Sequence, residues 1–109
     1  MTEKVDRDER LKAMVSQLPG VMNAFSGLQS EVVKDGALSA KTKGIMMVGI
    51  AVALRCEYCI SKHVSEAVRL GATREEIMEA VSTAILMTGG PAIAYGSAVV
   101  LKNLDELGI

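Results

Sequence analysis

The chain has 109 residues, which is the size of one domain rather than two, and its formal net charge is −1. A charge so nearly balanced provides no basic surface for nucleic acid and no acidic tail of the kind found in disordered segments. Half of the residues are hydrophobic, but only 3% are aromatic and Trp is absent, so Ala, Val, Ile, Leu and Met must form the core.

Two amphipathic helices are predicted in the first third of the chain. Between Asp6 and Leu18 the apolar side chains recur at i, i+3, i+4 and i+7, which is helical spacing, and Pro19-Gly20 ends this helix. Pro19 can also open the second helix, which ends at Asp35-Gly36, where Gly36 is expected to form a left-handed cap. Residues Met1 to Arg10 are strongly charged and lack the apolar stretch of a secretory signal.

The third predicted helix is apolar almost all round. It runs from Ala40 to about Leu54, and Ser39 is placed to cap its first turn. A helix without a polar face is expected at the centre of its domain or in an oligomer interface. The mean hydropathy of the chain is also positive, at +0.30, although a domain of this size buries only about two-thirds of its unfolded surface. Both features predict a homo-oligomer, in which other subunits cover part of the chain.

The fourth helix is expected to carry both cysteines and the histidine, to run to Leu70 and to end before Gly71. The sequence Thr73-Arg74-Glu75-Glu76 then forms a capping box, in which Thr73 is the cap and Glu76 lies three residues later. It is the clearest start signal in the chain, and it predicts that the fifth helix begins here.

The fifth helix extends to Met87, and a last helix runs from Pro91, in its first position, to about Leu107. The stretch Ala80–Leu101 has no charged side chain and is long enough to span a bilayer. Gly89-Gly90-Pro91 divides it, so two shorter buried helices that meet at a turn explain it better, and no membrane partner is expected. No alternating strand pattern survives these assignments. The predicted fold is therefore all-α, with about six helices in a single domain over residues 1–109.

Both cysteines and the only histidine lie within eight residues, spaced C-x-x-C-x-x-x-H. In a helix, Cys56 and Cys59 are three residues apart and His63 follows Cys59 by four, so all three are expected to project from one face. Without an export signal the expected compartment is the reducing cytoplasm. A C-x-x-C sequence there is more often redox-active or metal-binding than a structural disulfide.

A metal site is the less favoured interpretation of this motif. Structural zinc needs four ligands, and the two cysteines and the histidine supply three. A carboxylate such as Glu57 or Glu66, or a second subunit, would have to complete the set. Covalent haem attachment requires a histidine directly after the second cysteine, where this chain has Ile60. We therefore expect no metal and no cofactor.

Redox chemistry fits the spacing better. Two cysteines three residues apart at the start of a helix can close a small disulfide loop with little backbone movement. The helix N-terminus stabilises a thiolate, and His63, one turn onward, can take the proton or pair with the thiolate. A thiolate attacks peroxide oxygen to give sulfenic acid, which a second thiol converts to a disulfide. The alternative is that both cysteines are small buried hydrophobic residues.

The sequence resembles the carboxymuconolactone decarboxylase and alkylhydroperoxidase D family. The similarity lies in Lys41-Thr42-Lys43 before an apolar helix, then Cys56-Glu57-Tyr58-Cys59-Ile60, His63 and Gly71-Ala72-Thr73-Arg74-Glu75-Glu76-Ile77. It covers about residues 38–101, the expected core of the domain. The resemblance implies an all-helical fold assembled as a homotrimer or homohexamer. It also implies a peroxide-reducing dithiol, with a hydroperoxide as substrate and an unidentified thiol or dithiol as reductant.

By the same resemblance, Cys59 would be the thiol that becomes sulfenic acid, Cys56 its partner and proton donor, and His63 part of the proton relay. The chain departs from the family pattern at Gly44, where members usually have a glutamate. Glu66 or Glu57 could substitute for that carboxylate, although each is more often a solvated helix residue.

Two other functions remain open from the sequence. One is a decarboxylase-like lyase acting on a cyclic carboxylic acid, although such members of the family lack the cysteine pair. The other is a redox-sensitive helical oligomer without catalytic activity. Peroxide-driven loss of both free thiols would favour the peroxidase or disulfide oxidoreductase over either alternative.

Overall fold

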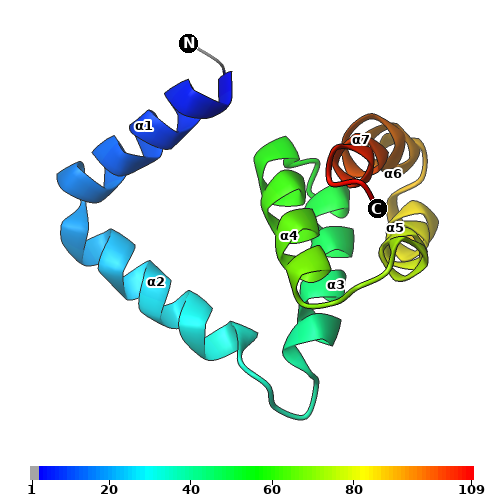
Figure 1. Cartoon of the computed structure of the whole chain (residues 1–109), viewed down its shortest axis with the longest axis horizontal. Helices are drawn as coiled ribbons and strands as arrows, with labels where there is room; N and C mark the ends of the chain where they lie inside the picture. Colours follow the sequence, from blue (N-terminus) through cyan, green and yellow to red (C-terminus); the bar gives the residue numbers. More distant parts are fainter. Residues whose placement is uncertain (1–2) are drawn as a thin grey trace. The chain divides into compact units, whose positions relative to one another are not determined.

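The computed structural model describes residues 3–109, with side chains from residue 6 onward, and this part of the chain is helical without any strand. The predicted all-α class is confirmed (Figure 1). In chain order the elements are α1 (Glu3–Gln17), α2 (Pro19–Val33), α3 (Ala40–Ala53), α4 (Glu57–Arg69), α5 (Arg74–Thr88), α6 (Gly90–Tyr95), the π-helix η1 (Gly96–Leu101) and α7 (Lys102–Glu106).

Contacts divide the chain into two units, residues 1–34 and residues 35–109. The first unit contains α1 and α2. The backbone hydrogen bonds from Leu18 N to Met14 O and from Met22 N to Leu18 O, both 2.9 Å, link the two helices. No side chain described in this unit is buried.

The connection between α2 and α3 differs from the prediction. Gly36 does not adopt the expected left-handed conformation, because the chain leaves α2 through Lys34 in an extended conformation, with φ −70° and ψ 158°. The Asp35 carboxylate then accepts a hydrogen bond from Ala40 N at 2.7 Å. The predicted cap at Ser39 is confirmed, since its hydroxyl accepts a hydrogen bond from Thr42 N at 3.0 Å.

Helix α3 is the centre of the second unit, as its apolar sequence predicts. Helices α4 and α5 both pack along it. The backbones of α3 and α5 approach closely at Gly49, where an added Cβ would lie 3.1 Å from the carbonyl oxygen of Ala80. The buried core consists of Val48, Ala51, Val52, Ile60, Val64, Ala67, Ala72, Ile77, Val81, Ala84, Ala92, Val99, Val100 and Leu104.

The capping box that opens α5 is confirmed. Thr73 Oγ1 accepts a hydrogen bond from Glu76 N at 3.1 Å, and the Glu76 carboxylate accepts one from Thr73 N at 2.9 Å. Glu76 also pairs with Lys41 of α3 at 3.2 Å, so the starts of the two helices are linked. At the other end of α5, Gly89 has φ 76°, which confirms that a glycine ends this helix.

The last predicted helix is continuous but not uniform. It begins at Gly90, so Pro91 is its second residue rather than its first. Its middle six residues form a π-helix, which the sequence pattern does not predict. The buried residues Ala92, Gly96, Val100 and Leu104 are spaced by four, and in an α-helix each such step rotates the side chain about 40° further round the axis. A π-helix has wider turns, with i→i+5 hydrogen bonds, and it therefore keeps these residues facing the core.

None of the helices within residues 3–109 is long and apolar enough to cross a membrane. The uncharged stretch 80–101 is interrupted at Gly89, between α5 and α6, as predicted.

Candidate functional site

The turn between α3 and α4 holds the cysteine motif in place. Arg55 N donates a hydrogen bond to Val52 O at 3.0 Å, and Cys56 N donates one to Ala51 O at 3.2 Å. Together these two bonds form a Schellman motif at the end of α3. In this motif the residue that donates the shorter-range of the two bonds has a left-handed backbone conformation. Arg55 fills that position with φ 56°.

The same motif ends two other helices, with a glycine in the left-handed position each time. Gly71 N and Ala72 N close α4, and Gly108 N and Ile109 N close α7. Among the described residues, Arg55 is therefore the non-glycine residue that has a positive φ, and it directly precedes Cys56. A left-handed conformation is unfavourable for a residue with a Cβ, so the chain carries local strain beside its motif.

Arg55→Gly is expected to stabilise the oxidised protein by about 1 kcal/mol, because glycine adopts the left-handed conformation without a Cβ clash. The measurement is the free energy of unfolding in urea. Gly71→Ala, in the same motif at the end of α4, is the reciprocal control and should lose a similar amount. A destabilising Arg55→Gly would instead show that the arginine side chain makes a favourable interaction of its own.

Cys56 and Cys59 are joined in a disulfide, with their Cα atoms 5.2 Å apart. Cys56 is the N-cap of α4, with an extended backbone, and its Sγ accepts a hydrogen bond from Cys59 N at 3.2 Å. The predicted arrangement of three residues on one helical face is therefore wrong for Cys56, which lies just before the helix. The cysteines are partly exposed, so a reagent in solution can approach the sulfurs.

A sulfur at an N-cap is in a favourable place for negative charge. The backbone N–H groups of the first turn point toward it, and the helix dipole is positive at this end. After reduction of the disulfide, the same interactions favour negative charge on the Cys56 sulfur. Cys59 Sγ, by contrast, accepts no hydrogen bond within the described part of the chain.

His63 lies one helical turn after Cys59 and is half-buried. Burial and the nearby positive charge of Lys62 lower the pKa of His63, and Glu66 opposes them in part. The imidazole is therefore neutral at pH 7 and has a nitrogen able to accept a proton. No hydrogen bond joins it to either sulfur in the oxidised protein, within residues 3–109.

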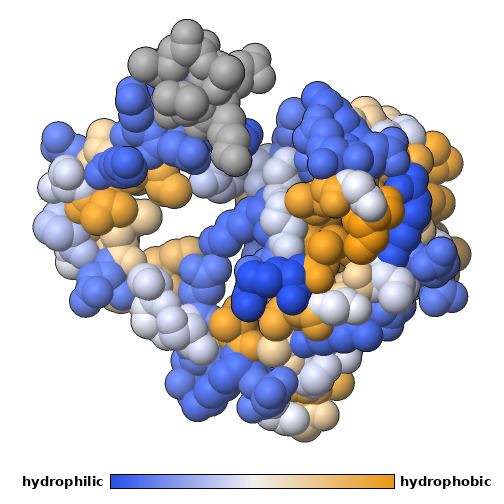
Figure 2. Space-filling view, viewed as in Figure 1, coloured by the Kyte–Doolittle hydropathy of each residue, from blue (hydrophilic) through white to orange (hydrophobic). Residues whose placement is uncertain are grey.

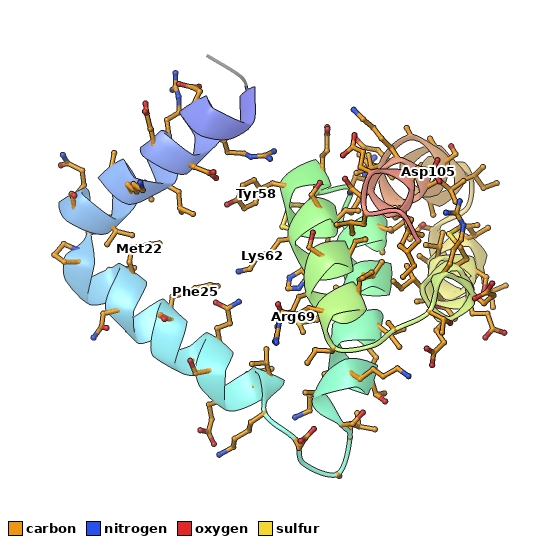
Figure 3. All side chains as sticks on the ribbon, viewed as in Figure 1. Met22, Phe25, Tyr58, Lys62, Arg69 and Asp105 are labelled. Carbon is orange, nitrogen blue, oxygen red and sulfur yellow. A yellow bond between two sulfur atoms is a disulfide. The ribbon has the colours of Figure 1, made fainter. Side chains whose placement is uncertain are left out.

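Glu66 forms an ion pair with Arg69. Its carboxylate accepts hydrogen bonds from both Arg69 Nε, at 3.0 Å, and Arg69 Nη2, and these bonds hold the pKa of Glu66 below its ordinary value. Tyr58, Lys62 and Arg69 all project from one side of α4 (Figure 3). The pairing with Arg69 makes Glu66 a poor substitute for the family carboxylate.

The oxidised protein is expected to lose stability as the pH falls below about 6.5. Because the pKa of His63 is lower in the folded state than in the unfolded state, the unfolded chain binds more protons in this range and gains stability relative to the fold. Urea unfolding at pH 7.5, 6.5 and 5.5 measures the effect, and His63→Gln should flatten it. Glu66 and Glu76 do not interfere, because their lowered pKa values place their titration below this range.

Gly44 is buried where α3 packs against α4. An added Cβ would lie 3.5 Å from Ala67 Cα and 3.6 Å from Leu70 Cδ1, which are ordinary van der Waals distances. Ala67 follows His63 by four residues and so shares its side of α4. Gly44, where the resemblance leads us to expect a carboxylate, therefore lies against a residue of α4 that is one helical turn from the histidine, and it has room for a β-carbon.

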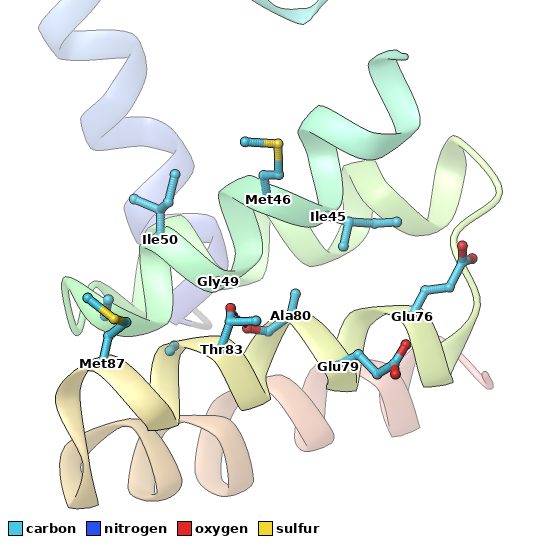
Figure 4. Close-up of a pocket in the computed structure, with 11 residues that line it drawn as sticks. Ile45, Met46, Gly49, Ile50, Glu76, Glu79, Ala80, Thr83 and Met87 are labelled. Atoms are coloured by element: carbon cyan, nitrogen blue, oxygen red, sulfur yellow. Dashed lines mark hydrogen bonds between the residues drawn. The ribbon is translucent and has the colours of Figure 1, made fainter. Parts of the chain in front are cut away.

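A groove of about 600 Å³ between α3 and α5 was not predicted from the sequence (Figure 4). Its α3 residues lie on the side of that helix away from Gly44, and so away from α4. Its lining is mostly apolar, apart from Glu76, Glu79 and Thr83. The groove depends on two helices that are separated in the sequence by the whole of α4, and the local sequence pattern of neither helix indicates it.

Across the residues with described positions, no three His, Cys, Asp or Glu side chains are grouped to hold an ion.

Comparison with known proteins identifies the family. The model of the carboxymuconolactone decarboxylase family matches residues 19–102. The chain belongs to this family. The match begins at the start of α2, so it includes α2 and not α1.

Solved structures of family members have the same fold. A carboxymuconolactone decarboxylase family protein from Legionella pneumophila is 39% identical, with a TM-score of 0.87 over 93% of this chain and 89% of that one. A Thermotoga maritima member, for which a part in the antioxidative response is suggested, is 36% identical, with a TM-score of 0.72 over 79% of this chain and 88% of that one. An uncharacterized protein of Cupriavidus necator is 34% identical over 97% of this chain and 93% of its own length.

Proposed function

We propose that the protein is a thiol-dependent peroxidase or disulfide oxidoreductase that cycles the Cys56–Cys59 pair. The observation that carries the proposal is the disulfide at the start of α4, with Cys56 Sγ on the helix N-terminus. A dithiol that closes to a disulfide inside one turn can take up two electrons and return them with little backbone movement. Membership of a family with a member of suggested antioxidative role agrees with this chemistry.

The proposed reaction begins with the reduced pair. The helix N-terminus holds Cys56 as the thiolate, which accepts the proton of Cys59. The Cys59 thiolate then attacks the distal oxygen of a hydroperoxide, so that an S–O bond forms and the O–O bond breaks. The alkoxide leaves and takes a proton from water to become the alcohol. His63, neutral at pH 7, is suited to accept the proton now on Cys56.

The second step closes the disulfide. Cys56 sulfur attacks the Cys59 sulfenic acid, the S–S bond forms, and hydroxide leaves and is protonated to water. The sulfurs have then lost two electrons and the peroxide has gained them. A thiol or dithiol reductant, entering from solution, returns the pair to the reduced state by thiol–disulfide exchange.

Thiol titration tests this proposal directly. One equivalent of an alkyl hydroperoxide is expected to remove both free thiols of the reduced protein and to yield one equivalent of alcohol. The disulfide should be intramolecular, which mass spectrometry of the unreduced chain verifies. Two free thiols remaining after the peroxide has been incubated with the protein would sink the proposal.

A further inference from the structure

The groove between α3 and α5 has an acidic end and an apolar end. The two helices start side by side, because Lys41 of α3 pairs with Glu76 of α5. Glu76 and Glu79 lie toward this end, whereas Ile50 and Met87 lie at the other (Figure 4). Glu79 and Met87 are eight residues apart in α5, which corresponds to about 12 Å along the helix axis. The groove can therefore hold an elongated ligand whose two ends differ in polarity.

The apolar wall of the groove is open to solvent. Met46, Ile50 and Met87 line it, with exposed fractions of 47%, 54% and 81%. The floor is made of small residues, since Gly49 and Ala84 are buried there. The volume of about 600 Å³ lies within the range of roughly 300–1,000 Å³ found for small-molecule sites. Methionine side chains adapt to irregular shapes, so this wall suits an alkyl chain.

The charge of its lining distinguishes this groove from other apolar surface, which appears elsewhere on the molecule as well (Figure 2). The charged side chains that line it, Glu76 and Glu79, are both acidic. The Glu76 carboxylate is engaged by Lys41 and by the backbone N–H of Thr73. Glu79 follows three residues later on the same side of α5 and is exposed. The groove therefore offers a carboxylate to a positively charged ligand.

An amine with an apolar chain matches both features of the groove. Its ammonium group can form a charge-assisted hydrogen bond with the Glu79 carboxylate, and it stays partly hydrated because this carboxylate is at the surface. The attached chain then covers the apolar wall, as the stem of a lysine covers apolar surface below its own charge. A carboxylic acid of the same shape would instead place a further negative charge beside Glu79 and Glu76.

We propose that the groove binds an amphiphilic amine, with its ammonium group on Glu79 and its apolar chain along Met46, Ile50 and Met87. The groove lies on the side of α3 away from α4, so this binding goes beyond the disulfide chemistry of α4 and does not depend on it. Loss of either activity should leave the other in place.

The test compares three probes that share one chain and differ in charge. Octylammonium, 1-octanol and octanoate are titrated into the oxidised protein at pH 7 in a calorimeter. Octylammonium is expected to bind about fivefold more tightly than octanol, as a partly exposed ion pair predicts, and octanoate should bind most weakly. Glu79→Gln should lower the affinity for octylammonium to that for octanol. Glu75→Gln removes the same charge from a residue of α5 that does not line the groove, and it should keep the preference.

Methyl resonances of the methionines locate the bound probe. In protein labelled with ¹³C at the methionine methyl groups, octylammonium should shift the signals of Met46 and Met87. Met14 has the same exposed fraction as Met46, 47%, but lies on α1, so its signal should stay in place. Glu79→Gln replaces an exposed side chain and should unfold in urea with the wild-type midpoint, which separates a lost ion pair from a lost fold.

Three results would overturn the proposal. Equal affinities for octylammonium and octanol in the wild type would show that Glu79 selects no charge. Equal shifts at Met14 and Met46 would show that the probe coats exposed apolar side chains without using the groove. Unshifted signals at both Met46 and Met87 would show that the groove is closed to small molecules in solution, as it would be beneath a second copy of the chain.

Discussion

Cys59→Ser is expected to reduce peroxide consumption to the background of the buffer, whereas Cys56→Ser should still react once and stop at the sulfenic acid. The structure supplies the reason for the difference. Cys56 Sγ accepts a hydrogen bond from Cys59 N–H at the helix N-terminus, and a thiolate stabilised in this way is a weaker nucleophile. Cys59 Sγ has no such hydrogen bond and is the freer of the two to attack oxygen.

A 1,3-diketone probe specific for sulfenic acid, followed by mass spectrometry, measures the outcome. The probe should label Cys59 in Cys56→Ser and leave Cys59→Ser unlabelled. The rate in Cys56→Ser should fall by roughly 100-fold or more, because serine cannot accept the proton of Cys59. Strong labelling of Cys56 in Cys59→Ser would exchange the two roles.

The pH dependence of alkylation by iodoacetamide separates thiolate formation from attack on peroxide. In Cys59→Ser the remaining thiol, Cys56, should be alkylated at a lower pH than Cys59 is in Cys56→Ser. The helix N-terminus acts on the first sulfur in both the wild type and the variant, since the backbone N–H of residue 59 is retained. Equal pKa values would show that the N-cap hydrogen bond has no electrostatic effect on the reduced protein.

The helix boundaries that the sequence predicts well are those set by side chains within a few residues. Ser39 and Thr73 each accept a hydrogen bond from a backbone N–H three positions later, and Gly71 supplies a left-handed residue where α4 ends. Such local interactions leave a direct trace in the sequence. The pairing of Cys56 with Cys59 is of the same kind, because the spacing alone brings the sulfurs together.

The features that the sequence does not reveal depend on packing between elements distant along the chain. Arginine is not a residue expected to be left-handed, yet Arg55 is, because the core on both sides of the turn dictates the path of α3 into α4. The π-helix follows from the need to keep Gly96 and Val100 on the core side, and at Gly96 an added Cβ would lie only 2.7 Å from Val81 Cγ1. At Gly36 the sequence predicts a left-handed residue that the structure does not have. The Asp35 carboxylate accepts a hydrogen bond from Ala40 N instead, and the segment has no left-handed turn.

Gly44→Glu is expected to accelerate peroxide-driven disulfide formation about tenfold and to lower the free energy of unfolding by about 1–3 kcal/mol. The cost arises because the new carboxylate would enter the interface between α3 and α4, near Leu70. The gain arises because Gly44 faces Ala67, one turn from His63. A carboxylate there would raise the pKa of His63, which burial now lowers, and so make the imidazole a better proton acceptor.

Two controls separate the charge from the shape of the new side chain. Gly44→Gln has nearly the same shape without the negative charge, and it should lose stability without a gain in rate. Gly44→Ala should be neutral or stabilising by up to about 1 kcal/mol, because its Cβ fits and alanine favours the helix. The rate is measured from the loss of thiols in single-turnover reactions at pH 7, and stability from urea unfolding of the oxidised form.

The three variants together decide how the proton leaves the dithiol. A faster rate in Gly44→Glu alone would mean that the native chain removes the proton with the helix N-terminus and a weakly basic histidine. The carboxylate that would complete the proton relay is then absent from the native chain. Equal rates in all three would mean that His63 and the N-cap already remove the proton faster than the sulfur attacks, so that a carboxylate has nothing to add. The gain should also disappear in Gly44→Glu combined with His63→Gln, because the proposed carboxylate acts through the imidazole and not on the sulfurs.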